Sequence, residues 1–128
     1  MAEASYPEDL LYHEEHDWAR VDGDSAIFGI TWYAQDALGE VVFFDPPKVG
    51  ASLSQGQSYA EIESVKAVSD VVAPLSGEVV EVNQAVSQTP ETVNDDPYGQ
   101  GWLVKVRLSD PAETESLMSA GDYEASLA

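Results

Sequence analysis

The chain has 128 residues, with 24 acidic and 5 basic side chains and a formal net charge of −19. Such an acidic surface repels the phosphates of nucleic acids and anionic lipids, so we expect neither nucleic-acid nor membrane binding. The chain has no cysteine, which excludes disulfides, thiol catalysis and cysteine-ligated metals. Its length and its 44% of hydrophobic residues predict one domain spanning residues 1–128.

The sequence shows no targeting signal. No apolar run reaches the roughly 20 residues that a membrane-spanning helix needs. Residues 1–6 are acidic and lack the basic, apolar and arginine-rich features of export and transit peptides. We therefore expect a cytoplasmic protein, with a bacterial or archaeal source favoured over an organellar one.

Most of the predicted elements are strands separated by turn signals. An Asp22-Gly23 pair divides the first two strands and predicts a hairpin. In the last strand, apolar side chains alternate with Lys105 and Arg107, which predicts one buried and one exposed face. In chain order, the expected strands cover Trp18–Val21, Ala26–Ile30, Val41–Phe44, Ser58–Ile62, Val71–Ala73, Glu78–Val82 and Trp102–Leu108.

Two helices are expected among the strands. Thr31 is a suitable N-cap for a short internal helix that ends at Gly39. The sequence Asp110-Pro111-Ala112-Glu113 resembles a capping box and predicts a C-terminal helix at about 110–120. Residues 87–100 are rich in Pro, Asn, Asp, Thr and Gly and predict a loop. The whole pattern indicates a mostly β fold, either a sandwich or a flattened barrel.

Lys66 is the most informative basic residue, because strand-prone segments flank it on both sides. Val65 is β-branched and disfavours a two-residue turn with positive φ, so we expect a four-residue turn, Ser64–Ala67, of type I geometry. Such a turn presents the lysine at the tip of a stiff hairpin, pointing away from both sheets. The alternative is a structural role, with Lys66 loosely paired with Glu63 or Asp70.

Lys66 belongs to a series of short motifs that follow one another in a fixed order. They are His16–Trp18, Gly29–Thr31, Ala34-Gln35, Leu38–Phe43, Glu63–Ala67, Ser69–Val71, Pro74, Ser76–Val79, Glu81–Asn83, Pro97-Tyr98 and Gly101-Trp102. Together they resemble the glycine cleavage system H protein family over nearly the full chain. The resemblance implies a lipoyl/biotinyl-type barrel-sandwich hybrid, with lipoic acid in amide linkage on Lys66.

The resemblance also implies a carrier with no active site of its own. In the family, a pyridoxal-phosphate glycine decarboxylase loads the aminomethyl group of glycine onto the lipoyl group. A tetrahydrofolate-dependent aminomethyltransferase then takes the methylene group and frees ammonia, and the FAD-containing dihydrolipoyl dehydrogenase reoxidises the dithiol. In a chain without cysteine, all dithiol chemistry has to come from such a cofactor. We expect a monomer, since the arm has to visit several active sites.

Attachment of the lipoyl group requires a lipoate ligase or a lipoyl/octanoyl transferase. Glu63, Ser64 and Ala67 surround Lys66 and are expected to serve recognition by that enzyme, because a rigid hairpin presents a fixed shape. Once attached, the tether gives the cofactor a high effective concentration at each partner.

The cargo carries an amine that needs a cleft sheltered from water, with a hydrogen-bond acceptor nearby. Asp17 matches the acidic family residue, usually Glu, that helps to hold this amine. Glu15 stands where a serine is common in the family, and Asp70 matches another polar contact. Carboxylates beside a cationic guest are electrostatically favourable.

Other functions are open on the sequence alone. An H-like protein could relay octanoyl or lipoyl groups to 2-oxoacid dehydrogenases, and an unmodified interaction module could keep the same fold. A biotin carrier is disfavoured, because Lys66 lacks the flanking methionines of biotinyl domains. His13 and His16 lie at a predicted strand entry without a third fixed donor, so we expect no metal site. Asp95-Asp96 has no companion nucleophile and is interpreted as solvated surface.

Several aromatic and glycine positions carry structural expectations. Trp18, Trp102 and Phe43 are expected in the core, and His16 is expected to pack beside Trp18. In the turn Pro97–Gly101, glycine is expected to supply positive φ.

Overall fold

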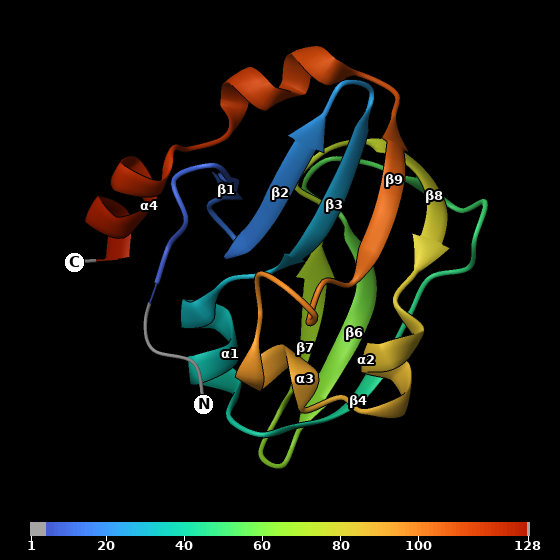
Figure 1. Ribbon diagram of the computed structural model, residues 1–128, viewed down its shortest axis with the longest axis vertical. Coiled ribbons are helices and arrows are strands. Elements are labelled where there is room, and N and C mark those ends of the chain that lie inside the picture. The colour runs from blue at the N-terminus through green and yellow to red at the C-terminus, as the bar shows by residue number, and fades with distance from the viewer. Residues whose placement is uncertain (1–4, 128) are drawn as a thin grey trace.

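Two antiparallel sheets packed on one another form the body of the molecule in a computed structural model that describes residues 5–127 (Figure 1). One sheet has the strand order β1-β2-β3-β9-β8-β5 and the other has the order β4-β6-β7. The strands are β1 Leu11–His13, β2 Asp17–Asp22, β3 Ser25–Ile30, β4 Val41–Asp45, β5 Ser52–Leu53, β6 Ser58–Ser64, β7 Val68–Val72, β8 Gly77–Val82 and β9 Val104–Leu108. The expected mostly β sandwich is confirmed.

Alternating side chains from both sheets fill the space between them. Strand β9 buries Val104, Val106 and Leu108, as its alternation predicted. A second, aromatic cluster lies where the C-terminal helix covers β1. It consists of Leu10, Tyr12, Trp18, Tyr98, Ala120 and Tyr123.

The predicted hairpin is formed by β2 and β3, and its close packing depends on a glycine. Trp18 lies opposite Gly29 in the register of the two strands. A Cβ atom at residue 29 would lie 2.5 Å from Trp18 Cζ2, so only glycine leaves room for the buried indole. Trp18 Nε1 also donates a hydrogen bond to the Pro97 carbonyl at 3.1 Å. The core position expected for Trp18 is therefore confirmed.

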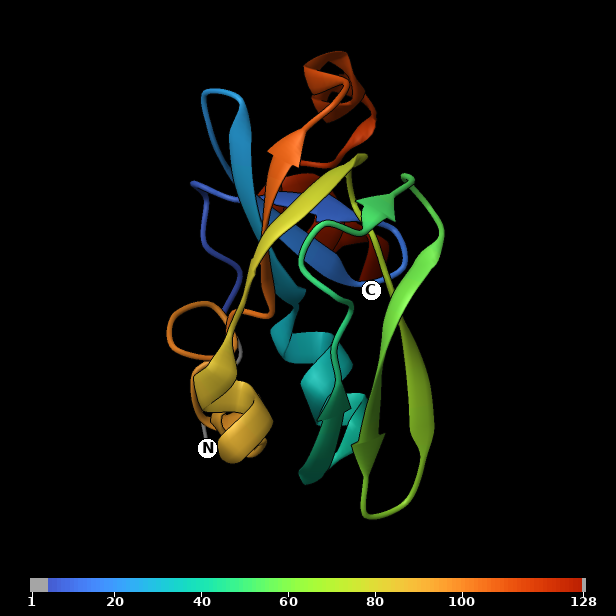
Figure 2. The same ribbon diagram turned by 90° about the vertical axis from the view of Figure 1, so that its right-hand side faces the viewer.

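The internal helix α1, Trp32–Leu38, has the predicted boundaries. The Thr31 side chain accepts a hydrogen bond from the backbone N–H of Ala34 at 3.2 Å. Gly39 ends the helix with a φ of +82°, a conformation that costs glycine little. Figure 2 shows α1 beside the β6–β7 hairpin, which extends to one end of the molecule.

The prediction of a loop over residues 87–100 was wrong, because two short helices cover part of it. Helix α2 spans Gln84–Gln88 and helix α3 spans Thr92–Asp95. Asn83 caps α2 by accepting a hydrogen bond from the Ala85 N–H at 3.0 Å. Buried Val86 and Val93 anchor the two helices, although the intervening composition is typical of a loop.

The C-terminal helix is present, but it lies later than the predicted 110–120. A 3₁₀ helix spans Pro111–Ser116, and the α-helix α4 spans Ala120–Leu127. Met118 between them forms a β-bridge with Tyr12, through backbone hydrogen bonds of 2.8 and 2.9 Å. This bridge interrupts the helix. Glu113 also differs from a capping-box residue, since its carboxylate accepts hydrogen bonds from Ser76.

Two further expectations were wrong. Phe43 is 49% exposed rather than buried. Trp102, in contrast, is partly buried and packs against the aromatic core cluster. Gly99 and Gly101 do not have positive φ; a Cβ at Gly101 would lie 2.7 Å from the Asp96 carbonyl oxygen, so close backbone approach explains that glycine. No helix within residues 5–127 is long and apolar enough to cross a bilayer.

Candidate functional site

Strands β6 and β7 form the hairpin that carries Lys66, and its turn has the predicted length. Glu63 and Val68 are the last paired residues, which leaves the four-residue turn Ser64–Ala67. The Ser64 N–H donates to the Ala67 carbonyl at 2.8 Å, and the Ala67 N–H donates to Ser64 Oγ at 3.1 Å. None of these four residues has positive φ. The Ser64 side chain therefore holds the turn in a fixed shape.

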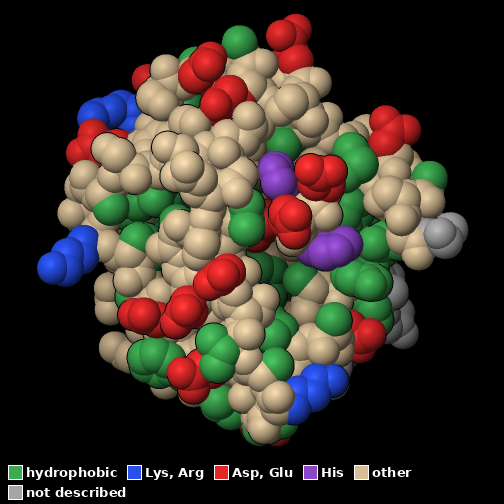
Figure 3. Space-filling model, turned by 180° about the vertical axis from the view of Figure 1, so that it is seen from behind, with side chains coloured by type: hydrophobic (Ala, Val, Ile, Leu, Met, Phe, Trp, Pro, Cys, Tyr) green, Lys and Arg blue, Asp and Glu red, His purple; other side chains and the backbone are tan. Residues whose placement is uncertain are grey.

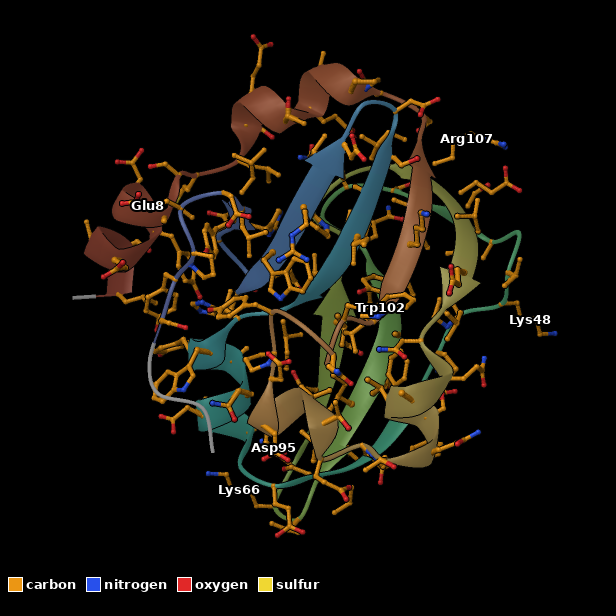
Figure 4. The ribbon with its side chains drawn as sticks, viewed as in Figure 1. Glu8, Lys48, Lys66, Asp95, Trp102 and Arg107 are labelled. Carbon is orange, nitrogen blue, oxygen red and sulfur yellow. The ribbon has the colours of Figure 1, made fainter. Side chains whose placement is uncertain are left out.

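Lys66 is exposed at this tip and leans over the C-terminal end of α1. A Cβ atom at Gly39 would lie 3.4 Å from Lys66 Cε. The backbone N–H of Val65 donates to the Glu40 carbonyl at 3.0 Å, which ties the turn to the residue before β4. Among residues 5–127 the ion pair is Arg107 with Glu78, so Lys66 is not paired with Glu63 or Asp70. Figure 4 shows Lys66 far from Lys48 and Arg107.

A cleft of about 320 Å³ lies beside the hairpin. One wall is α1, the other is Ala67 and β7, and the base is the start of β2. The cleft brings together the three predicted carboxylates, Glu15, Asp17 and Asp70, which are far apart in the sequence. Figure 3 shows this face, with the two histidine side chains close to several carboxylates. Its volume is in the range of pockets that bind small molecules.

Asp17 lies at the base of the cleft and is only 2% exposed. One of its carboxyl oxygens accepts a hydrogen bond from the Val72 N–H, while Oδ2 has no partner among the described residues. Burial raises the pKa of the Asp17 carboxyl well above its usual range, and the nearby Glu15 raises it further. A buried polar atom without a partner is uncommon, and this one is enclosed at the base of the cleft.

His16 forms part of the cleft wall, held by residues that the sequence analysis did not identify. Its Nδ1 lies 2.8 Å from the Tyr123 hydroxyl, and its ring centroid lies 4.5 Å from that of Tyr33. The ring contacts of His16 are thus with Tyr33 and Tyr123, and its expected packing beside Trp18 stays a prediction. His16 has a φ of +73°, the one positive value among the described non-glycine residues. Strained backbone of this kind is maintained only where surrounding contacts fix it.

The hydroxyl groups around His16 define its tautomer. The Tyr123 hydroxyl lies 2.8 Å from Thr31 Oγ1, which is itself buried and accepts the N–H of Ala34. The arrangement that pairs every buried hydroxyl proton has Thr31 donating to Tyr123 and Tyr123 donating to His16 Nδ1. Burial lowers the pKa of His16, which favours the neutral ring. This arrangement places the His16 proton on Nε2.

Tyr123→Phe tests this assignment. Removing the hydroxyl leaves the Thr31 hydroxyl proton without an acceptor and His16 Nδ1 without a donor, so we expect a stability loss of about 1–3 kcal/mol. We also expect the ¹⁵N chemical shifts of His16 to move away from the Nε2-protonated form. Tyr33→Phe removes a more exposed hydroxyl and is the matched control. An unchanged His16 spectrum in Tyr123→Phe would contradict the tautomer assignment.

A buried amide network supports the end of α1 where Lys66 rests. Asn94 Nδ2 donates to Gln35 Oε1 at 2.9 Å and to the Gly39 carbonyl at 2.8 Å. Its Oδ1 accepts the N–H of Val41 at 2.9 Å. Asn94 thus connects α3, α1 and the start of β4. A polar residue in a segment predicted as loop gave no signal of this role.

The other candidate residues serve structure. His13 Nδ1 accepts the backbone N–H of Glu15 at 3.1 Å, and Asp96 accepts the N–H of Gln100 at 2.9 Å. Asp95 is exposed, as expected for solvated surface. Within residues 5–127, no three His, Asp or Glu side chains are grouped so that they could hold a metal ion.

Comparison with known proteins gives the family. Residues 10–128 match the family described as glycine cleavage H-protein. The chain belongs to the glycine cleavage H-protein family. The H protein of Symbiobacterium thermophilum is 52% identical over 122 residues, which cover 95% of both chains. A mitochondrial H protein of Arabidopsis thaliana is 52% identical over 115 residues, 90% of this chain and 74% of the relative.

A solved structure confirms the fold of the H-protein family for this chain. The crystal structure of the H protein from Mycobacterium marinum superposes with a TM-score of 0.87 at 41% identity, covering 94% of this chain and 98% of the other. The barrel-sandwich fold implied by the motifs is thereby confirmed. Membership of the family supports a lipoyl-carrier role in the glycine cleavage system.

Proposed function

We propose that Lys66 carries a lipoyl group in amide linkage and that the cleft beside α1 shelters the far end of this arm. The observation that supports the proposal most directly is the position of Lys66. It is exposed, it has no ion pair within residues 5–127, and it lies next to a cleft with a buried carboxyl at its base. On this proposal the chain is a carrier, and the chemistry belongs to its partner enzymes.

The residues of the site fit such a group. Ser64 fixes the backbone of the turn, so the point from which the Lys66 side chain projects is held in one place. Leu38, Ile62 and Val71 give the cleft apolar walls, which suit an aliphatic chain. The lipoyl group, when bound, supplies the disulfide and dithiol that a chain without cysteine lacks.

The side chains of the cleft act on the amine of the cargo. Asp17 is neutral over a wider pH range than an exposed aspartic acid, because burial disfavours its charge. An amine drawn to the base of the cleft would take the proton from this carboxyl, and the resulting ion pair would satisfy the unpartnered oxygen. Exposed Glu15 and Asp70 line the same cleft and attract the cation. The apolar walls would keep water away from the loaded end of the arm.

We propose the glycine decarboxylase, the aminomethyltransferase, dihydrolipoyl dehydrogenase and a lipoate-attaching enzyme as partners. Acylation removes one ammonium and takes the formal net charge from −19 to −20. The negative electrostatic field of such a protein accelerates its encounters with basic partner surfaces, and salt screens this field.

The experiment that tests the proposal is intact mass measurement with peptide mapping. The protein is incubated with lipoate, ATP and a lipoate ligase whose activity is shown on a control lipoyl domain. We expect the mass of one lipoyl group, confined to Lys66. No gain in mass would favour an unmodified interaction module, and a lipoylated protein inactive with glycine decarboxylase would favour the lipoate relay.

A further inference from the structure

Exposed apolar side chains gather around Lys66. Within residues 5–127, seven large hydrophobic side chains are exposed, and four of them lie in β4, in the turn or at the start of β7. These four are Val42, Phe43, Val65 and Val68. Exposed apolar side chains gathered on one part of a surface are typical of a protein–protein contact.

Three strands place part of this surface in one row. Phe43 lies opposite Glu63 in the register of β4 and β6, and Glu63 lies opposite Val68 in that of β6 and β7. Residues directly opposite one another on neighbouring strands project from the same face of a sheet. Phe43, Glu63 and Val68, which we name the tip row, are all exposed, with Phe43 at 49% and Val68 at 60%.

A β-bulge turns this part of β4 outward. The register shifts between Val41 and Phe43, so that Val42 and Phe43 are both exposed while Val41 and Phe44 are buried. Regular alternation would have buried one of the two. Bulges re-aim side chains and are common beside functional sites. The core gains nothing from exposing Phe43, so a contact outside the chain is the better explanation.

We infer that the tip row is the docking surface for the enzyme that acylates Lys66, an inference that rests on the proposed function. The reach of the lysine favours this partner over the others. The Lys66 amine is only four methylenes from the backbone. The acylating enzyme therefore has to contact the turn and the tip row beside it. Enzymes that act on the dithiolane meet it at the far end of a much longer arm.

The chemistry of the tip row specifies the facing surface of the enzyme. Phe43 and Val68 require apolar contacts on either side of a central carboxylate, Glu63. Glu40 and Glu61 are also exposed nearby on the same strands or their flanks. We therefore expect two apolar patches separated by a basic side chain on the enzyme, with further basic residues at the rim.

The test is the kinetics of a lipoate ligase on Phe43→Ala and Val68→Thr. Truncating an anchor residue of an interface costs at least about a factor of ten in binding, so with Phe43 as the anchor we expect KM for the protein to rise about tenfold in Phe43→Ala. The isosteric Val68→Thr should raise KM severalfold. Val80→Ala removes a 42% exposed valine from β8, in the other sheet, and should leave KM unchanged.

Two controls separate docking from folding and from reactivity. Melting temperatures should match the wild type, since Phe43 and Val68 are exposed, and a chemical acylating reagent should modify Lys66 equally in all variants. A KM of Phe43→Ala within twofold of wild type would overturn the docking surface alone. A wild-type protein that an active ligase never acylates would overturn the carrier function, and the docking surface with it.

Discussion

Replacing Lys66 by arginine is expected to abolish lipoylation and to leave the fold unchanged. A guanidinium group stays protonated near neutral pH and is not acylated, although it preserves the positive charge. Lys66 is exposed and has no ion pair among residues 5–127, so the substitution removes no native contact of consequence. Intact mass after incubation with the ligase should show no lipoyl group, against complete modification of the wild type. The melting temperature should stay within about one degree.

Lys48→Arg and Lys105→Arg are the matched controls, since they change the other two lysines in the same way. Both should be lipoylated at the wild-type rate. A lipoyl group found on Lys66→Arg, or mapped to Lys48 or Lys105 in the wild type, would contradict the attachment site.

Asp17→Asn is expected to change stability in a pH-dependent way. The raised pKa means that the folded protein holds the Asp17 proton more tightly than the unfolded chain, whose value is near 3.8. The contribution of this group to the free energy of unfolding is therefore fully present below about pH 4, and it is lost as pH rises through the folded-state pKa. Its size is about 1.4 kcal/mol for each unit by which the folded-state pKa exceeds the unfolded one. Asparagine does not titrate, so the free energy of unfolding of the variant should increase relative to that of the wild type as pH rises from 4 to 8. Denaturant unfolding across this range measures the difference.

The same substitution should weaken the binding of the aminomethyl amine in the cleft. Asparagine cannot form an ion pair with the amine, so ammonia should be released faster from the loaded Asp17→Asn protein, by about tenfold if one charge-assisted hydrogen bond is lost. Glu15→Gln changes an exposed carboxylate of the same cleft and should have a smaller effect. Equal ammonia release in Asp17→Asn and wild type would exclude Asp17 from the site, and parallel stability curves would contradict its raised pKa.

The hairpins and the Lys66 turn could be predicted because short-range rules determine them. Asp22-Gly23, the Thr31 cap and Gly39 are each local signals, and β-branched Val65 indicated the wider turn. The carboxylates of the cleft were inferred from a resemblance, since nothing local relates Asp17 to Asp70, which lies 53 positions later in the chain. The structure places them in one cleft.

The errors have physical causes at particular residues. The bridge between Met118 and Tyr12 breaks a helix that the local pattern favoured. The bulge in β4 exposes Phe43, which composition alone places in a core. Tyr123 could not be connected with His16 from sequence, because their contact spans 107 positions and depends on how α4 packs over β1.

The long separation between His16 and Tyr123 also bears on the order in which a nascent chain matures. The β6–β7 hairpin closes locally, whereas the cleft wall needs Tyr123, which follows Val72 by roughly 50 residues. At ribosomal rates of about 5–20 residues per second, the hairpin precedes the wall by about 3–10 s. Lys66 is therefore synthesised before the residue that completes the shelter, so an enzyme that modified the chain during translation would meet it without this wall of the cleft.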